Sequence, residues 1–167
     1  MFDDELTLAA SQVLEAARAR GALVVTAESC TGGLVAAALT AIAGSSDVVD
    51  GGFITYSNAA KAALGVPQHL LDTDGAVSES VARALAEAAR RTVLARTALP
   101  TVSVSVTGVA GPGGGSAEKP VGLVHFAATS AFGTVHQEVR FGDLGRADVR
   151  RQSILTAFSM LREVLTD

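Results

Sequence analysis

The sequence predicts an α/β protein, a three-layer α/β/α sandwich with a mixed sheet of about five strands. Segments with the 3.6-residue apolar period of helices alternate with short apolar runs, which is the pattern of strands joined by crossover helices. The early apolar runs are almost continuous, as in parallel strands covered on both faces. Toward the C-terminal end a tight turn joins two strand-like runs, so the last two strands are expected to form an antiparallel hairpin.

The chain has 167 residues, 49% of them apolar, which favours a single domain over residues 1–167 with one core. The first half predicts a helix, a strand, a helix, a strand and a short helix, at residues 5–20, 23–27, 31–41, 48–56 and 58–64. The glycine pair at 51–52 favours a bulge in the second strand, and Asp3 or Asp4 can cap the first helix. The second half predicts a helix at 78–97, strands at 101–106, 121–129 and 134–141, and a final helix at 148–165.

Composition and charge exclude several classes of function. Thirteen basic against seventeen acidic residues give a formal charge of −4, without the basic run that nucleic-acid binding needs. No apolar stretch reaches the roughly 18 residues that cross a membrane. The single cysteine, Cys30, cannot form an intrachain disulfide, and the three histidines lack the spacing of metal ligands. We therefore expect a cytoplasmic protein without a metal site.

Ser29 lies at the junction of the first predicted strand and the helix that follows. The N–H groups of residues 30–33 would point out of the start of that helix and could hold an oxyanion or a phosphate. Capping of the helix by Ser29 and Thr31 explains the same residues equally well. A serine nucleophile would also need a base.

Lys61 is the candidate base. It falls one turn into the helix after the second strand, and helical side chains lean toward their own N-terminus, so its amine would reach Ser29 if the first two strands are neighbours. Tyr56 would lie at the same edge of the sheet. A lone helical lysine is usually a solvated charge, but eleven of the thirteen basic residues are arginine, and an amine that must lose a proton cannot be arginine.

The glycine-rich segment 107–115 follows the third strand and leads to another strand rather than to a helix. It therefore fits neither a P-loop nor a dinucleotide-binding fingerprint. It is either a backbone surface that cradles a small ligand or a mobile connection. The last helix begins with Arg146, Arg150 and Arg151, which its dipole disfavours unless an anion is bound there, so Arg146 is the preferred phosphate contact.

Several short segments, taken in order, resemble the CinA C-terminal domain family. They are T-A-E-S-C-T-G-G at 26–33, I-A-G-S-S at 42–46, Y-S-N-A-A-K at 56–61, G-A-V-S at 75–78, T-G-V-A-G-P at 107–112 and K-P-V-G at 119–122. The series covers nearly the whole chain and is far more specific than any one motif. One motif departs from the family pattern, because Gly145 stands where Asp is expected before Arg146, although Val149 and Arg150 keep their spacing.

The resemblance implies an enzyme. Stand-alone members of the family are nicotinamide-nucleotide amidases, which hydrolyse nicotinamide mononucleotide to nicotinate mononucleotide and ammonia, and longer members carry a further N-terminal domain. It implies Ser29 as nucleophile, Lys61 as general base and Tyr56 as an assisting hydroxyl, with no metal or cofactor. The predicted substrate-binding residues are then Cys30, Thr31, Gly32, Gly33, Thr107, Gly108, Ala110, Gly111 and Arg146.

Two other functions fit the same sequence. The chain could be a non-catalytic module that binds nucleotides or assembles with other proteins, or a serine/lysine amidase for a different small amide. The expected partner is a small nucleotide substrate, with neither nucleic acid nor membrane, and a protein of this size is compatible with a homodimer.

Overall fold

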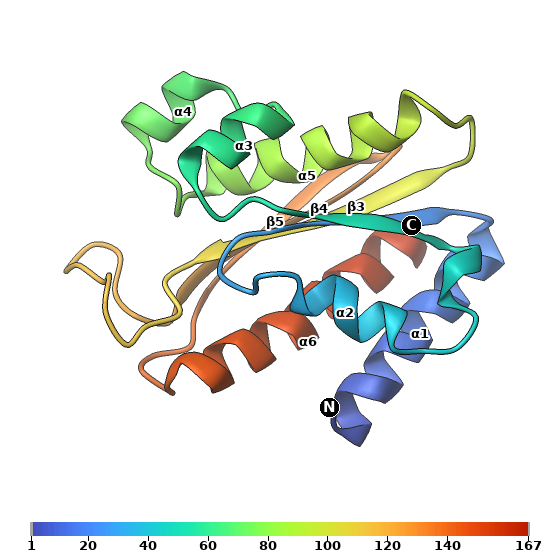
Figure 1. Ribbon diagram of the computed structural model, residues 1–167, viewed down its shortest axis with the longest axis horizontal. Helices are drawn as coiled ribbons and strands as arrows, with labels where there is room; N and C mark the ends of the chain where they lie inside the picture. Colours follow the sequence, from blue (N-terminus) through green and yellow to red (C-terminus); the bar gives the residue numbers. More distant parts are fainter. Residues whose placement is uncertain (1, 167) are drawn as a thin grey trace.

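Five strands form one mixed sheet in the computed structural model, which describes residues 2–166 (Figure 1). They lie in the order β2–β1–β3–β4–β5 and span Val49–Ile54, Leu23–Glu28, Thr101–Gly108, Leu123–Ser130 and Gly133–Arg140. The strands β2, β1 and β3 are parallel, whereas β4 runs antiparallel to both β3 and β5. The predicted mixed sheet with a C-terminal hairpin is confirmed.

Three helices cover each face of this sheet (Figure 1). One face carries α1 (Asp4–Arg20), α2 (Leu34–Thr40) and α6 (Arg146–Thr166), and the other carries α3 (Asn58–Leu64), α4 (Gln68–Thr73) and α5 (Glu79–Leu94). Val24 packs into the core beneath the first group, and its neighbour Val25 packs into the core beneath the second. Successive side chains of a strand point to opposite faces, which is why a doubly covered strand reads as a continuous apolar run.

Local sequence signals explain where α1 and α3 begin. Asp3 accepts a hydrogen bond from Leu6 N at the start of α1, and Ser57 accepts one from Ala60 N at the start of α3. Serines also bind a helix to the sheet, because the buried hydroxyls of Ser103 and Ser105 on β3 donate to backbone carbonyls of α5. Such bonds satisfy polar side chains that would otherwise be costly to bury.

Three differences from the predicted elements stand out, and the other bounds differ by at most three residues. The prediction ended the helix after β2 at residue 64, which is confirmed, but missed the short helix α4 that follows. The predicted strand 48–56 is shorter, Val49–Ile54, and its register against β1 shifts at the residue before Gly51, close to the predicted bulge. Finally, α2 begins at Leu34 rather than at residue 31. The hydrogen bonds of the turn before it, described with the candidate site, explain this later start.

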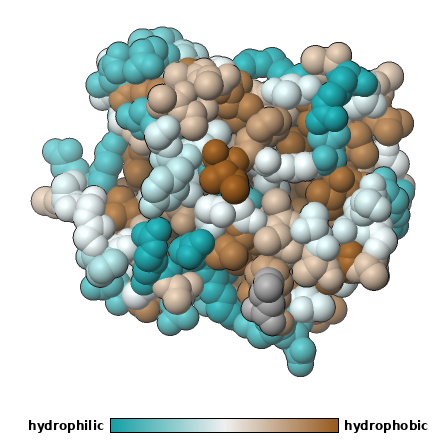
Figure 2. Space-filling model, in the orientation of Figure 1, coloured by the Kyte–Doolittle hydropathy of each residue, from teal (hydrophilic) through white to brown (hydrophobic). Residues whose placement is uncertain are grey.

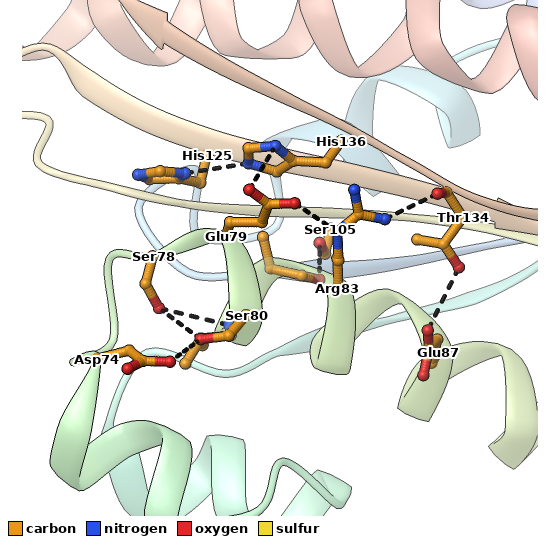
Figure 3. A network of polar contacts seen from close by, with 12 residues as sticks. Asp74, Ser78, Glu79, Ser80, Arg83, Glu87, Ser105, His125, Thr134 and His136 are labelled. Atoms are coloured by element: carbon orange, nitrogen blue, oxygen red, sulfur yellow. Dashed lines mark hydrogen bonds and ion pairs between the residues drawn. The ribbon is translucent and has the colours of Figure 1, made fainter.

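Two histidines connect β4 and β5 to the start of α5 (Figure 3). His125 Nδ1 and His136 Nε2 are 3.1 Å apart, and His136 Nδ1 lies 3.5 Å from the Glu79 carboxylate. Arg83 donates to Glu79 and to the carbonyl of Thr134. Burial lowers the pKa of both histidines, which favours their neutral form. Their place in this network supports a structural role.

Among residues 2–166 no helix meets the length and hydropathy needed to cross a membrane. The face in Figure 2 carries apolar side chains in its middle and hydrophilic ones toward its rim. Ile54, at the end of edge strand β2, is 60% exposed.

Candidate active site

A cavity of about 290 Å³ lies at the carboxyl ends of β1 and β3. The turn after the first strand, residues 56–61 and the glycine-rich segment 107–115 all contribute to it. Its lining residues are Ser29, Cys30, Tyr56, Asn58, Lys61, Ala76, Val77, Thr107, Gly108, Val109, Ala110, Gly111, Gly113, Gly114 and Arg146. Open α/β sheets bind ligands beyond the carboxyl ends of their parallel strands, so this cavity is the candidate site.

Ser29 and Lys61 meet at the base of this cavity. Ser29 directly follows β1, Lys61 lies in α3, and β1 pairs with β2, the strand that leads into α3. Lys61 Nζ is 3.0 Å from Ser29 Oγ. The expected approach of the amine to the serine is therefore present, and it depends on the predicted neighbouring positions of the first two strands.

The Lys61 amine is buried without a counter-ion. The side chain is 1% exposed, and its other acceptors are the backbone carbonyls of Thr55, at 2.7 Å, and Tyr56, at 3.4 Å. No carboxylate of the described residues forms an ion pair with it. Burial therefore lowers the pKa of Lys61 below the 10.5 of an ordinary lysine, which favours the neutral amine that a base requires.

Glu28, the last residue of β1, organises the turn that carries Ser29. Its carboxylate is 1% exposed and accepts hydrogen bonds from the N–H groups of Gly33, Val35 and Ala36, at 2.9–3.0 Å. The hydroxyl of Thr26 donates to it as well. A carboxylate at the start of a helix is stabilised by the free N–H groups there, so Glu28 takes the place that the prediction left open for a ligand.

The start of α2 is therefore a correction to the sequence prediction. The residues between Ser29 and Leu34 form turns, in which the Gly32 N–H donates to the Ser29 carbonyl and the Gly33 N–H donates to Glu28. Thr31, Gly32 and Gly33 do not line the cavity, so the structure does not bring these three predicted substrate-binding residues to it. Cys30 does line the cavity, and its N–H donates to no other residue among residues 2–166.

We expect the substitution Glu28→Gln to destabilise the fold. An amide keeps one acceptor oxygen and turns an NH₂ group toward N–H donors, so the free energy of unfolding should fall by about 3 kcal/mol. Urea denaturation at neutral pH measures it. Glu15→Gln, on the exposed side of α1, is the matched control and should stay within about 0.5 kcal/mol of the wild type. Equal urea midpoints for Glu28→Gln and the wild type would contradict this account of the turn.

Cys30 is a poor candidate for the nucleophile. Its side chain is 5% exposed, and burial raises the pKa of its thiol to about 11. The thiolate is the reactive form of cysteine, so this thiol is unreactive near neutral pH. Ser29, with an amine within hydrogen-bonding distance, is the better placed of the two.

Tyr56 and Arg146 lie at the mouth of the cavity. Tyr56 is 63% exposed, and its hydroxyl accepts a hydrogen bond of 3.3 Å from Arg146. Arg146 also donates to the carbonyl of Gly111, at 2.9 Å, so it connects α6 to the glycine-rich segment. The Tyr56 hydroxyl contacts neither Ser29 nor Lys61; only its backbone carbonyl reaches the amine. The predicted assisting hydroxyl is therefore not in contact with the pair in this structure.

The glycine-rich segment forms one wall of the cavity. A Cβ on Gly108 would lie 2.7 Å from the carbonyl oxygen of Leu123, so β3 and β4 approach closely here because the side chain is absent. Thr107 directs its hydroxyl to the carbonyl of Ala76, which joins this wall to the loop before α5. Gly113 and Gly114 have open space where a Cβ would be. Of the two alternatives left open by the sequence, the surface that cradles a ligand agrees better with this placement.

The prediction missed six of the lining residues: Asn58, Ala76, Val77, Val109, Gly113 and Gly114. Asn58 could have been found, because it precedes Lys61 by three residues and so lies on the same side of α3. Ala76 and Val77 could not be placed from spacing, since they reach the cavity through a loop that leads from the unpredicted helix α4 to α5.

Comparison with known proteins shows the family of this chain. Residues 6–165 match the family model described as the CinA C-terminal domain. The chain belongs to the CinA C-terminal domain family. A CinA-like protein of Synechococcus sp. (strain RCC307) is 52% identical over 162 residues, which cover 96% of this chain and 37% of that protein. One from Anaeromyxobacter dehalogenans (strain 2CP-C) is 53% identical over 150 residues, which cover 88% of this chain and 35% of that protein.

Solved structures of CinA-family proteins share the whole fold. The competence/damage inducible protein CihA of Agrobacterium tumefaciens has a TM-score of 0.91 and 48% identity, over 100% of this chain and 99% of that one. A CinA superfamily protein of Klebsiella pneumoniae has a TM-score of 0.86 and 33% identity, over 96% and 98% of the two chains. The chain thus spans little more than a third of the curated CinA-like relatives and nearly all of these solved chains.

Proposed function

We propose that this CinA-family chain is a nicotinamide-nucleotide amidase, in which residues 1–167 act as one domain that hydrolyses nicotinamide mononucleotide to nicotinate mononucleotide and ammonia. The observation that carries the proposal is the buried contact of 3.0 Å between Lys61 Nζ and Ser29 Oγ, in which the amine forms no ion pair with a carboxylate of the described residues. A desolvated amine beside a hydroxyl is the arrangement that activates a serine for acyl transfer.

The reaction begins when neutral Lys61 takes the proton of Ser29. Its two N–H groups have acceptors in the carbonyls of Thr55 and Tyr56, so its lone pair is free for the serine hydroxyl. Ser29 Oγ then bonds to the carboxamide carbon, and negative charge develops on the amide oxygen. We assign the N–H of Cys30, a residue of the cavity lining, as the donor that stabilises that oxygen.

The intermediate collapses as the carbon–nitrogen bond breaks. Protonated Lys61 returns its proton to the nitrogen, and ammonia leaves an ester on Ser29. Lys61 then takes a proton from water, the water oxygen attacks the ester carbon, and nicotinate mononucleotide is released as Ser29 regains its proton. Each step uses the same lysine as base and then as acid, and no step uses a metal or a cofactor.

The substrate phosphate would bind at the mouth of the cavity. Arg146 is the cation there, and its present partners, the Gly111 carbonyl and the Tyr56 hydroxyl, are neutral groups that an anion can displace. Residues of the glycine-rich segment line the same cavity. Binding of the phosphate would hold the pyridine ring near Ser29.

We therefore expect Arg146→Ala to raise KM for the mononucleotide about tenfold or more, with a smaller change in kcat, because a charge-assisted phosphate contact is lost. Steady-state kinetics with the mononucleotide and with nicotinamide riboside measure the effect. The riboside lacks the phosphate, so its use should be poor in the wild type and nearly unaffected by Arg146→Ala. An equal loss for both substrates would contradict a phosphate contact at this residue.

Release of ammonia from nicotinamide mononucleotide by the purified chain tests the proposed function. We expect stoichiometric ammonia and nicotinate mononucleotide. A parallel sample is treated with a fluorophosphonate, which labels activated serines. Labelling of Ser29 without ammonia release would replace the proposal with an amidase for another small amide. Absence of both would identify a non-catalytic binding module.

A further inference from the structure

Arg150 lies behind the turn that carries Ser29. It belongs to α6, and its guanidinium donates to the carbonyl of Thr31 at 2.9 Å. A Cβ on Gly32, which has a φ of +60°, would lie 3.4 Å from the same guanidinium nitrogen, so the turn and the arginine are in close contact. Arg150 does not line the cavity, and so it cannot act by touching a substrate there.

A chain of hydrogen bonds leads from Arg150 to the Cys30 N–H. The Thr31 carbonyl that accepts from Arg150 shares a peptide group with the Gly32 N–H, and this N–H donates to the Ser29 carbonyl at 3.1 Å. The Ser29 carbonyl in turn shares a peptide group with the Cys30 N–H. Hydrogen bonds in series polarise one another, so a cation at one end strengthens the donor at the other.

The charge of Arg150 is available for this effect. Its neighbour Arg151 pairs with Asp3 and Glu5, whereas Arg150 takes part in none of the ion pairs of residues 2–166. Its Nε is buried and has no hydrogen-bond partner among the described residues. Burial dominates at the Cys30 thiol and raises its pKa, but the charges of Arg146 and Arg150 oppose that rise, so positive charge is felt beside Ser29.

We infer that Arg150 is a positioning residue for acyl transfer, which orients and polarises the Cys30 N–H as an oxyanion donor through the peptide groups of Thr31–Gly32 and Ser29–Cys30. The inference rests on the proposed function of Ser29. Because Arg150 acts where charge develops and not where substrate binds, it contributes to kcat and leaves KM nearly unchanged.

The test uses two readouts on the purified chain. The first is the steady-state release of ammonia from nicotinamide mononucleotide. The second is the rate at which a fluorophosphonate phosphonylates Ser29, followed by intact-protein mass. In that step Ser29 Oγ bonds to phosphorus, the phosphorus–fluorine bond breaks, fluoride leaves and the serine proton passes to Lys61. The phosphonyl oxygen occupies the oxyanion position, so this rate reports the donor whatever the natural substrate is.

We expect Arg150→Met to lower kcat and the phosphonylation rate by a similar factor, about tenfold, which is less than loss of a whole oxyanion donor, with KM within about twofold of the wild type. Arg150→Lys, which keeps the charge, should recover part of both rates. Arg151→Met, which removes the adjacent arginine and its ion pairs with Asp3 and Glu5, is the matched control and should leave both rates unchanged.

A folded Arg150→Met protein that phosphonylates Ser29 at the wild-type rate would overturn the inference, as would a variant whose KM rises while kcat is retained. Arg150→Gln is prepared alongside it, and either folded uncharged variant decides the question. Failure of the proposed function is distinguishable: a wild type that is phosphonylated but releases no ammonia has a different substrate, whereas a wild type without phosphonylation lacks the serine chemistry itself.

Discussion

Replacement of Ser29 by alanine should abolish the release of ammonia from nicotinamide mononucleotide, with kcat reduced by about 10⁴-fold or more, as for other nucleophiles that form an acyl-enzyme. The reason is that the Ser29 hydroxyl lies 3.0 Å from the buried amine of Lys61 and is the nucleophile of the proposed reaction. Folding should be retained, because the Ser29 N–H bonds to the Val106 carbonyl through the backbone, which alanine keeps. Single-turnover assays and a thermal melt measure both properties.

Cys30→Ala separates the two candidate nucleophiles. This variant keeps the backbone N–H and loses a thiol whose pKa burial raises to about 11. We expect it to retain most of the wild-type kcat. An inactive Cys30→Ala protein together with an active Ser29→Ala protein would reverse the assignment.

Lys61→Arg should be nearly as damaging as Lys61→Ala, with kcat lowered by about 10²–10⁴-fold, the usual contribution of a general base. Arginine keeps the positive charge but does not lose its proton, and its larger planar head must fit where the lysine side chain is 1% exposed. Activity assays on folded variants measure the loss. A Lys61→Arg enzyme with a kcat close to that of the wild type would show that the lysine supplies charge only.

The pH dependence follows from the same residue. Burial lowers the pKa of Lys61, so the neutral base becomes available at a lower pH than for an ordinary lysine. Activity should rise with pH along a single ionisation on the acid side and level off once the amine is neutral.

Most of the fold was predictable because it follows local patterns, and doubly covered strands such as β1 give continuous apolar runs. The approach of Lys61 to Ser29 needed one non-local condition as well, that the first two strands are neighbours. That condition holds, and one helical turn after β2 then sets the position of the amine. The capping residues Asp3 and Ser57 are likewise local signals.

The sequence could not show which hydrogen-bond donors and acceptors the fold would bring together. A backbone partner for Glu28 was expected from its place beside the turn, but the spacing did not indicate which N–H groups its carboxylate would bind. Its bonds at the start of α2 remove Gly33 from the ligand site. The hydrogen bond from Arg146 to the Tyr56 hydroxyl joins residues that lie 90 positions apart, and only the folded chain brings them together. From the sequence, Arg150 could only be placed near the start of the last helix. The fold brings it into contact with the turn that carries Ser29.

The ionisation of Lys61 itself tests the central claim most directly. The chain has only two lysines, Lys61 and Lys119, so lysine labelled with ¹³C at Cε gives two side-chain signals, which Lys119→Arg assigns. NMR titration of the Lys61 signal in the folded protein measures its pKa. We predict a midpoint clearly below 10.5, because the amine is buried beside Ser29 and forms no ion pair with a carboxylate of residues 2–166. A midpoint at or above 10.5 would contradict it, since the amine could not then serve as the base for Ser29 near neutral pH.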